Sequence, residues 1–320
     1  MAGRYIRSGA REMHPSFRQL RLFLALADTG SVSAAARTLH VTQPTASMQL
    51  RELSDAVGMP LYEVVSRRVR LTPLGQELAQ TARRMQSEWD NFRQVADATR
   101  GLERGRLAIS VVSTAKYFIP RWLGSFYADH PGIDVALQVL NRDGVVQRLR
   151  ANLDDLYVMS QPPADIELED RVFLPNPLVV IARANHPLRS ARRLDWKRLA
   201  TETFILREQG SGTRMACEAH FRAAGISPRV RLELGSNEAI KQAVAGGLGL
   251  AIVSTHALGS HLGEEGLVVL PVQGFPIHSQ WHLVQPRARR LSPIASVFRE
   301  HVLRQAGLAA AAAPLTRRRR

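Results

Sequence analysis

The chain has 320 residues, of which 45% are hydrophobic and 22% charged, with a single cysteine. This length favours two or three globular units, and one cysteine excludes an intrachain disulfide and a cysteine-rich zinc site. No apolar run reaches the roughly 18 residues of a membrane span, and the first residues lack the apolar core of a secretory signal. We therefore expect a cytoplasmic protein without a membrane partner.

The formal net charge of +15 favours an anionic partner, such as nucleic acid or a phosphorylated metabolite. Residues 1–104 contain 15 arginines and 10 acidic residues, which gives +5, so the remaining +10 lies further along the chain. Charge alone is therefore weak evidence that the N-terminal part binds DNA.

Two short helices are predicted near the start of the chain. Residues 1–13 are polar and are expected to be disordered. Apolar residues then recur with the spacing of one helical face, which predicts a helix from Phe17 that Gly30 ends. Ser31 is the expected N-cap of a second, alanine-rich helix, and His40–Val41 is the expected turn after it.

A third helix has the pattern of a DNA reader. Thr42 is its expected N-cap, and Pro44 falls in its first turn. A recognition helix places its N-terminal residues near base edges in the major groove, where glutamine pairs with adenine and arginine with guanine. The alternative is an ordinary three-helix bundle with a polar outer face. The predicted DNA-contacting residues of this region are Ser31, Thr42, Gln43, Pro44, Thr45, Ser47, Met48 and Arg51.

A small hairpin and a long helix are expected next. Residues 61–65 and 69–71 are predicted strands around a turn that contains Arg67 and Arg68, which could contact phosphate or the minor groove. A solvated charge run is the alternative. Residues 14–72 would then form a winged helix-turn-helix domain. Residues 73–104 are predicted to form a linker helix that dimerises, because apolar residues recur in it every seven positions.

The run from FRQLRLFLALADTGSVSAAARTLHVTQPTASMQLRELSDAVGMPLYE to RRVRLTPLGQ closely resembles the N-terminal domain of LysR-type transcriptional regulators. The resemblance covers about residues 14–104. It implies that the helix beginning at Gln43 reads DNA and that the helix beginning at Pro73 dimerises. Met48 and Val64 stand where many members of that family have arginine, and these departures bear on the base readout.

The second half of the chain alternates short strands and helices, which predicts an α/β domain. Asp143 is the expected cap of the helix after the second strand. We expect two lobes over residues 105–305, the first at about 105–177 and 277–305 and the second at about 178–276, followed by a disordered Ala/Arg tail at 306–320. The fold class is therefore α+β multi-domain. The predicted strands are 107–112, 133–140, 156–159, 178–182, 204–206, 230–234, 250–253 and 280–284.

The predicted effector site follows from where these strands end. Open α/β sheets bind ligands beyond the carboxyl ends of their strands, and helix N-termini bind anions. The implied ligand is a small anion; the alternative is that the same residues are only caps and surface ion pairs. The predicted effector-binding residues are Ser113, Thr114, Lys116, Asn141, Arg142, Arg207, Gly210, Ser211, Gly212, Thr213, Arg214, Asn237 and Glu238.

The segments STAKYF, NRDGVVQRL, NPLVVIA, REQGSGTR and ELGSNEAIKQAVAGGLG resemble the LysR-type regulators of Calvin-cycle RuBisCO operons. That resemblance implies an effector domain like a periplasmic binding protein and activation of carbon-fixation genes. It implies no cofactor, but an effector such as a sugar phosphate, phosphoenolpyruvate or NADPH. The partners are then double-stranded DNA, further copies of the chain as dimers and tetramers, and RNA polymerase. The segment Tyr157-Val158-Met159-Ser160 stands where the subgroup more often has smaller residues, and this segment is expected to narrow the cleft.

An enzyme or a cytoplasmic solute-binding protein on the same two-lobed scaffold is the competing class, and a LysR-type regulator of a different metabolic operon is a further alternative. The sequence contains no GxxxxGK[ST], HExxH, GxSxG or CxxC motif. Its ten histidines have no metal-ligand spacing. We therefore expect neither catalytic residues nor a metal site.

Overall fold

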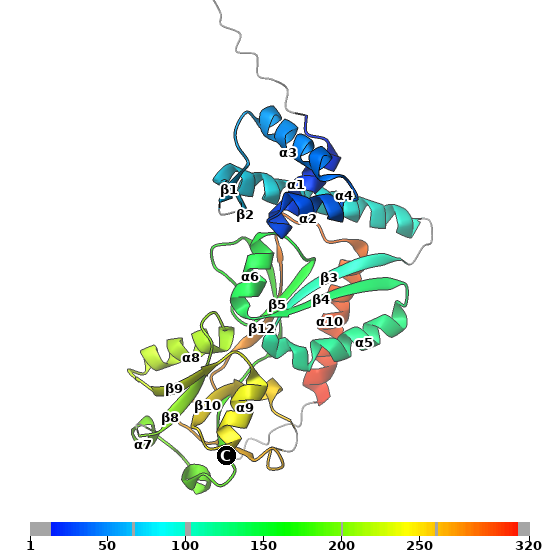
Figure 1. The fold of residues 1–320 in the computed structure, drawn as a ribbon. Coiled ribbons are helices and arrows are strands. Elements are labelled where there is room, and N and C mark those ends of the chain that lie inside the picture. The colour runs from blue at the N-terminus through cyan, green and yellow to red at the C-terminus, as the bar shows by residue number, and fades with distance from the viewer. Residues whose placement is uncertain (1–13, 66–67, 100–103, 200, 260–261, 313–320) are drawn as a thin grey trace, which may run out of the picture. The chain divides into compact units, whose positions relative to one another are not determined.

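The computed structural model describes residues 14–65, 68–99, 104–199, 201–259 and 262–312 (Figure 1). The predicted N-terminal extension 1–13, the wing residue Arg67 and residues 100–103 of the predicted linker helix lie outside the described residues. The chain forms two compact units, residues 1–90 and 91–320.

The first unit is built on three helices, α1 (Phe17–Thr29), α2 (Val32–Thr38) and α3 (Gln43–Val57). Their shared core includes Leu22, Phe23 and Leu53, which are fully buried. Ala35, Ala36 and Ala46 are also buried, and such small side chains let helix backbones approach closely. The periodicity of the sequence therefore predicted this part of the fold correctly.

Side-chain caps fix where these helices begin. The Ser31 hydroxyl accepts a hydrogen bond from the backbone N–H of Ala34, and the Thr42 hydroxyl accepts one from that of Thr45. Gly30 ends α1 in the left-handed conformation, with φ of 63°, which glycine adopts without steric cost. The predictions for all three positions are confirmed.

The wing consists of the antiparallel strands β1 (Tyr62–Val65) and β2 (Arg68–Leu71). Arg68 pairs with Val65 across the hairpin, so the prediction that Arg68 lies in the turn is wrong. The ladder extends one residue further than the apolar pattern, because backbone pairing does not require an apolar side chain. Helix α4 (Pro73–Thr99) follows, and the Thr72 hydroxyl accepts a hydrogen bond from Gly75 at its start.

The second unit contains two five-stranded sheets, each the centre of one lobe (Figure 1). The first sheet has the order β4-β3-β5-β12-β6. Strands β3, β4 and β5 are parallel, and β12 runs antiparallel to β5 and β6. Its elements are β3 (Gly105–Val112), α5 (Ile119–Asp129), β4 (Ile133–Leu140), α6 (Arg142–Arg150), β5 (Leu156–Met159), β6 (Leu168–Pro175), β12 (Gln280–Pro286) and α10 (Pro293–Ala312).

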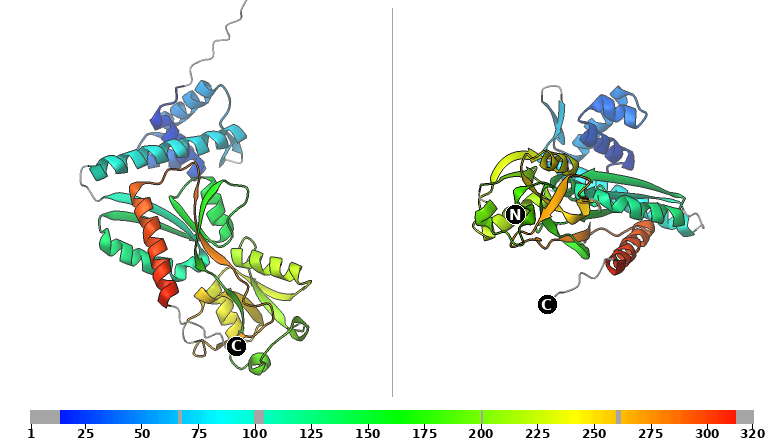
Figure 2. Two further views of the ribbon diagram at one scale, coloured as in Figure 1. Left: turned by 180° about the vertical axis from the view of Figure 1, so that it is seen from behind. Right: turned by 90° about the horizontal axis from the view of Figure 1, so that it is seen from below.

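Helices cover both faces of the first sheet. Strand β4 lies on one side of β3, and β5 lies on the other. The connections β3–α5–β4 and β4–α6–β5 therefore run in opposite directions across the sheet, and right-handed crossovers place α5 and α6 on opposite faces. Helix α10 lies beside α5 (Figure 2). The rings of Phe126 on α5 and Phe298 on α10 pack edge to face, with their centroids 5.0 Å apart.

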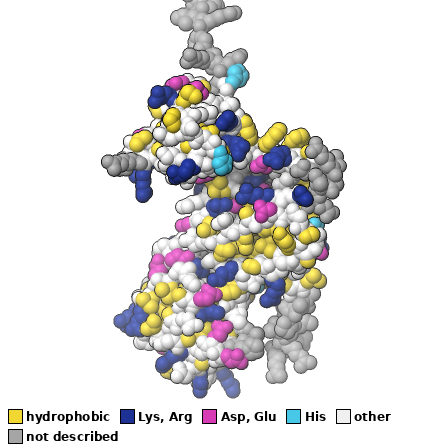
Figure 3. All heavy atoms as spheres, turned by 45° about the vertical axis from the view of Figure 1, so that its right-hand side comes forward, with side chains coloured by type: hydrophobic (Ala, Val, Ile, Leu, Met, Phe, Trp, Pro, Cys, Tyr) yellow, Lys and Arg dark blue, Asp and Glu magenta, His cyan; other side chains and the backbone are white. Residues whose placement is uncertain are grey.

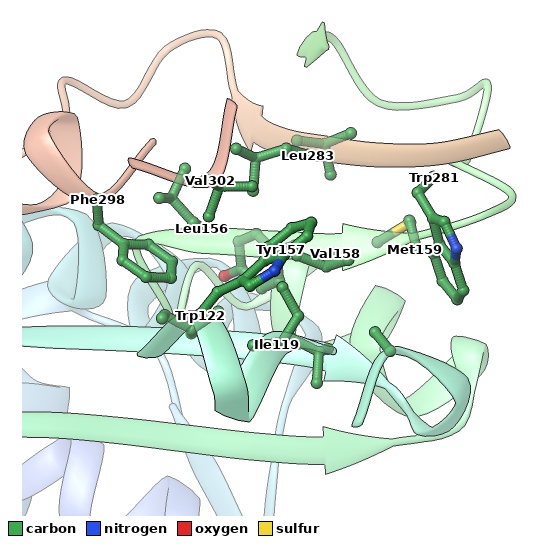
Figure 4. Packing of buried hydrophobic residues seen from close by; sticks show 14 of the residues in the cluster. Ile119, Trp122, Leu156, Tyr157, Val158, Met159, Trp281, Leu283, Phe298 and Val302 are labelled. Atoms are coloured by element: carbon green, nitrogen blue, oxygen red, sulfur yellow. The ribbon is translucent and has the colours of Figure 1, made fainter. Parts of the chain in front are cut away.

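Tyr157 belongs to the core of this lobe and not to a cleft (Figure 4). Its ring is fully buried, its hydroxyl accepts a hydrogen bond from the backbone of Asp154, and it donates one to the carbonyl of Arg148. The expectation that this segment narrows the cleft is therefore wrong for Tyr157, Val158 and Met159, because β5 buries all three side chains in the core of the lobe.

The second sheet has the order β11-β7-β10-β8-β9. The chain enters it after β6 and returns to the first sheet at β12, so the first lobe is discontinuous in sequence. Cys217 is buried in its core. The elements are β7 (Leu178–Arg183), α7 (Trp196–Leu199), β8 (Thr203–Arg207), α8 (Gly212–Ala223), β9 (Arg229–Leu234), α9 (Asn237–Ala245), β10 (Leu250–Ser254) and β11 (Leu267–Leu270).

The fold class is confirmed, with several local corrections. Asn141, and not Asp143, caps α6, because its side chain accepts from the backbone of Gly144. Helix α10 continues to Ala312, so the prediction of disorder is wrong for residues 306–312; alanine is the strongest helix former and extends the last helix. Residues 313–320 lie outside the described residues. Strands β6 and β11 were not predicted: β6 has three consecutive charged, exposed residues and only one buried residue, and β11 has four residues.

Within the part of the chain that the structure describes, no helix is long and apolar enough to span a membrane.

Candidate DNA-binding and effector sites

The predicted DNA-reading residues of α3 form one exposed face. Gln43, Pro44 and Arg51 are exposed, and Met48 keeps 55% of its surface accessible. The Gln43 side-chain amide lies 3.5 Å from the Ser47 hydroxyl, one helical turn further on. An amide, a hydroxyl, a thioether and a guanidinium are therefore presented together, which is the mixture of groups that reads base edges.

The remaining predicted DNA-contacting residues lie at the N-terminus of α3, just before α2 and in the wing. The hydroxyls of Thr42 and Thr45 are hydrogen-bonded to each other at 2.8 Å, next to the helix N-terminus. Ser31 begins α2, so its hydroxyl is engaged as a cap. Arg68 is exposed in the second wing strand.

A buried arginine, Arg207, links the two lobes at the candidate effector site. Arg207, at the end of β8, is 3% exposed. Its guanidinium donates to the Ser113 hydroxyl of the first lobe at 3.0 Å and to the Asn237 side-chain oxygen at 3.1 Å. The Asn237 amide in turn donates to the Thr114 hydroxyl at 3.1 Å. Predicted residues from three strand ends therefore meet at one place.

Lys116 and Glu238 form a second connection between the lobes. Lys116 belongs to the short 3₁₀ helix η1 (Ser113–Tyr117), and its Nζ atom lies 2.7 Å from the Glu238 carboxylate at the start of α9. The Tyr117 hydroxyl donates to the same carboxylate. Burial opposes ionisation of Glu238, but the hydrogen bonds from Lys116 and Tyr117 outweigh it and lower the pKa of Glu238 to about 2. This carboxylate is therefore charged at neutral pH.

The N-termini of α6 and α8 meet at a third contact. The backbone N–H of Asp143 donates to the carbonyl of Gly210 in the other lobe at 3.1 Å. Gly210 has φ of 78°, and a Cβ atom there would lie 2.5 Å from the Asp143 carboxylate, so only glycine permits this approach. Asn141 caps α6, and Ser211 caps α8 while almost fully buried. Both helix N-termini are thus ordered by side chains beside the interlobe contact.

Two arginines near these N-termini already have several partners. Arg142 donates to the carbonyl of Gln161 at 2.6 Å, and its Cδ atom lies near Gly212. Arg214 follows Thr213 on α8 and pairs with Glu218 and Glu233, both in its own lobe. Arg214 therefore ties α8 to β9 within one lobe, whereas the other predicted residues cluster where the lobes meet.

Sequence reasoning missed Glu208 and Tyr117 at this site, and it singled out Ser160 only as part of the segment expected to narrow the cleft. Both Glu208 carboxylate oxygens accept from the Arg207 guanidinium, at 2.7 and 2.9 Å. Ser160 follows β5, and its hydroxyl lies within 3.0 Å of the position of a Cβ on Gly212. The rule that ligands bind beyond strand ends pointed to Ser160 as directly as to Ser113. No comparable signal identified Glu208 as the partner of Arg207.

A winged helix-turn-helix together with a two-lobed α/β domain whose strand ends converge defines a DNA-binding regulator controlled by a ligand. The family model "Bacterial regulatory helix-turn-helix protein, lysR family" matches residues 17–76, and the model "LysR substrate binding domain" matches residues 100–307. The chain belongs to the LysR family of transcriptional regulators.

Similar curated proteins are named as regulators of the RuBisCO operon or as transcriptional activators. The RuBisCO operon transcriptional regulator of Allochromatium vinosum is 45% identical over 294 residues, which cover 92% of this chain and 97% of that protein. The transcriptional activator CmpR of Synechocystis sp. is 42% identical over 284 residues, covering 89% and 93%.

Solved structures support the fold of both parts. The regulatory domain of Synechocystis PCC6803 CcmR, solved in complex with 2-PG, is 45% identical, with a TM-score of 0.62 over 63% of this chain and 98% of that one. A full-length OxyR variant of Pseudomonas aeruginosa matches with a TM-score of 0.72 over 92% of this chain and 95% of that one, at 21% identity.

Proposed function

We propose that this regulator activates a carbon-fixation operon that includes RuBisCO, in response to a small anionic effector of the 2-phosphoglycolate type. The relatives named above support the operon, and the CcmR domain supports the ligand class. The observation that carries the effector proposal is the network in which Ser113 and Thr114 of one lobe meet Arg207 and Asn237 of the other. A ligand bound there touches both lobes and can favour one arrangement of them.

DNA binding is assigned to α3 and the wing, with two copies of the chain acting together. Leu74 and Met85 are exposed on α4, in line with the predicted role of this helix in dimerisation. Footprinting on the promoter region of a RuBisCO operon tests the target. Protection of an unrelated metabolic promoter, with none at the RuBisCO operon, would favour the alternative LysR-type role.

The other predictions about partners stay predictions. They concern contact with RNA polymerase, assembly of dimers into tetramers and a cytoplasmic location. Sugar phosphates, phosphoenolpyruvate and NADPH remain alternatives to 2-phosphoglycolate, and thermal shifts measured with each of them compare these ligands directly.

Thr114→Ala is expected to weaken effector binding about tenfold while DNA binding persists. The substitution removes the hydroxyl that accepts a hydrogen bond from the Asn237 amide. A buried polar group left without a partner costs roughly 1–3 kcal/mol. The measurement is the thermal shift of the purified protein with each effector; a ligand at 100 times its dissociation constant adds about 2.7 kcal/mol of stability. Ser227→Ala, at an exposed position before β9, is the control. Equal shifts in all three proteins would remove Thr114 from the site.

We also propose that Met48 reads a thymine methyl group. It is the large apolar side chain exposed in the middle of the reading face of α3, and the thymine C5-methyl is the apolar group of the major groove. Replacing the contacted thymine with deoxyuridine, which lacks only this methyl, should weaken wild-type binding about fivefold, roughly 1 kcal/mol. Met48→Ala should bind the two operators equally. A variant that still prefers thymine would contradict the assignment.

A further inference from the structure

The cations predicted for the effector site all have carboxylate partners. The described pairs are Lys116–Glu238, Arg142–Asp143, Arg207–Glu208 and Arg214–Glu218, with nitrogen–oxygen distances of 2.7, 3.3, 2.7 and 2.5 Å. On one face of the second unit, Figure 3 likewise shows Lys and Arg side chains lying among Asp and Glu side chains. An anionic effector therefore meets cations that are already paired with carboxylates. To form an ion pair with one of these cations, the effector must displace its carboxylate partner.

One of these four pairs links the lobes. Lys116 lies in η1 of the first lobe and Glu238 at the start of α9 in the second, whereas each of the other pairs lies within a single lobe. Glu238 accepts from Lys116 and from the neighbouring Tyr117 hydroxyl. The hydroxyl of Ser236, the N-cap of α9, donates to the Glu238 carboxylate at 3.4 Å. An anion that takes Lys116 from Glu238 therefore also removes a connection between the lobes.

The Lys116–Glu238 ion pair lies where replacing Glu238 with another anion costs little free energy. The Lys116 side chain is 38% exposed and that of Glu238 is 47% exposed, and ion pairs with this much solvent contribute little to stability. Arg207, by contrast, is buried and held by Ser113, Asn237 and both oxygens of Glu208. Displacing Glu208 would leave the buried Arg207 guanidinium without its charged partner, which is costly. Lys116 is thus the cation that an effector can reach.

We propose that Glu238 is a built-in competitor of the effector, which occupies Lys116 when no ligand is bound and selects for anions that carry more charge than a carboxylate. The proposal rests on the proposed function of this site as an effector site. A monocarboxylate replaces one carboxylate with another and gains little. A phosphate group carries up to two charges and three strong acceptor oxygens, so it outcompetes Glu238. The same exchange breaks the Lys116–Glu238 link and couples ligand binding to lobe geometry.

Glu238→Gln in the full-length protein is the test, with calorimetric titration of 2-phosphoglycolate and, separately, of glycolate. Removing the competing charge should tighten 2-phosphoglycolate binding about three- to fivefold, the range expected for releasing a solvent-exposed ion pair. Glycolate binding should improve at least as much, so the preference for the phosphorylated ligand should fall. Glu265→Gln breaks the Lys241–Glu265 pair within the second lobe, whose lysine is not among the predicted effector-binding residues, and this control should bind as wild type does. Weaker binding by Glu238→Gln would instead show that Glu238 holds the ligand itself, and would overturn the proposal.

Hydrogen exchange without ligand provides a second measurement. Glu238→Gln should speed exchange of backbone amides in residues 113–117, because the lobes lose one of their links, while Glu265→Gln should not. Unchanged exchange there would contradict the role of Glu238 as a link between the lobes. If the wild-type protein binds none of the phosphorylated probes, the proposed function of the site fails, while the exchange experiment still decides whether Glu238 connects the lobes.

Discussion

Gly75→Ala is expected to destabilise the winged domain by about 3 kcal/mol or more, the upper part of the range for overpacking. Gly75 lies in the first turn of α4, where a Cβ atom would be 1.9 Å from the carbonyl oxygen of Leu61 and 2.9 Å from its carbonyl carbon. Both atoms belong to the backbone, so no side-chain rotation relieves the overlap. Leu61 is fully buried and directly precedes the wing, so the variant should also lose specific DNA binding.

Urea unfolding followed by circular dichroism measures this effect, with Gly124→Ala as the matched control. Gly124 lies inside helix α5, and a Cβ atom there would meet nothing within 4 Å. Alanine is favoured over glycine in a helix by up to about 1 kcal/mol, so the control should be as stable as wild type or more stable. A Gly75→Ala protein that unfolds at the wild-type urea concentration would show that α4 can shift to accept the methyl group.

Local signals in the sequence predicted the winged domain well because they act within one helix or one turn. The periodic apolar residues of α1 to α3 and the caps Ser31 and Thr42 each depend on neighbours a few positions away. The same holds for the central strands of both lobes, whose apolar runs are buried from both faces. Strand β6 escaped prediction because its charged side chains face solvent at the edge of the sheet, and only its backbone pairing with β12 reveals it.

The effector site was predictable in its residue types but not in its electrostatics. Strand ends rich in hydroxyls and glycine pointed to Ser113, Thr114 and Asn237, and the structure brings these residues together. The partner of Lys116 is 122 positions away in the chain, a separation at which residue spacing carries no information. The sequence therefore predicts which cations lie near the site, whereas the folded chain determines which carboxylates balance them.

Arg51→Ala and Gln43→Ala are each expected to weaken binding to the specific operator about 10- to 100-fold, because a well-placed base contact contributes roughly 1–3 kcal/mol. Both side chains are exposed on α3, and neither is among the buried residues of that helix. The stability of both variants should therefore match that of the wild type, and fluorescence anisotropy with labelled operator measures the loss. Arg222→Ala removes an equally charged, exposed side chain on α8 and should leave DNA binding unchanged.

The salt dependence of binding separates two roles for Arg51. If it neutralises a phosphate, the slope of log affinity against log salt should fall by about 0.9 in the variant, and specific and nonspecific DNA should weaken together. If it reads guanine, the slope should change little and discrimination at one base pair should be lost. Gln43 carries no charge, so its variant should keep the wild-type slope and lose specificity alone. Unaltered footprints in both variants would mean that α3 is not the reading helix, in which case the exposed face that it shares with Met48 would need another partner.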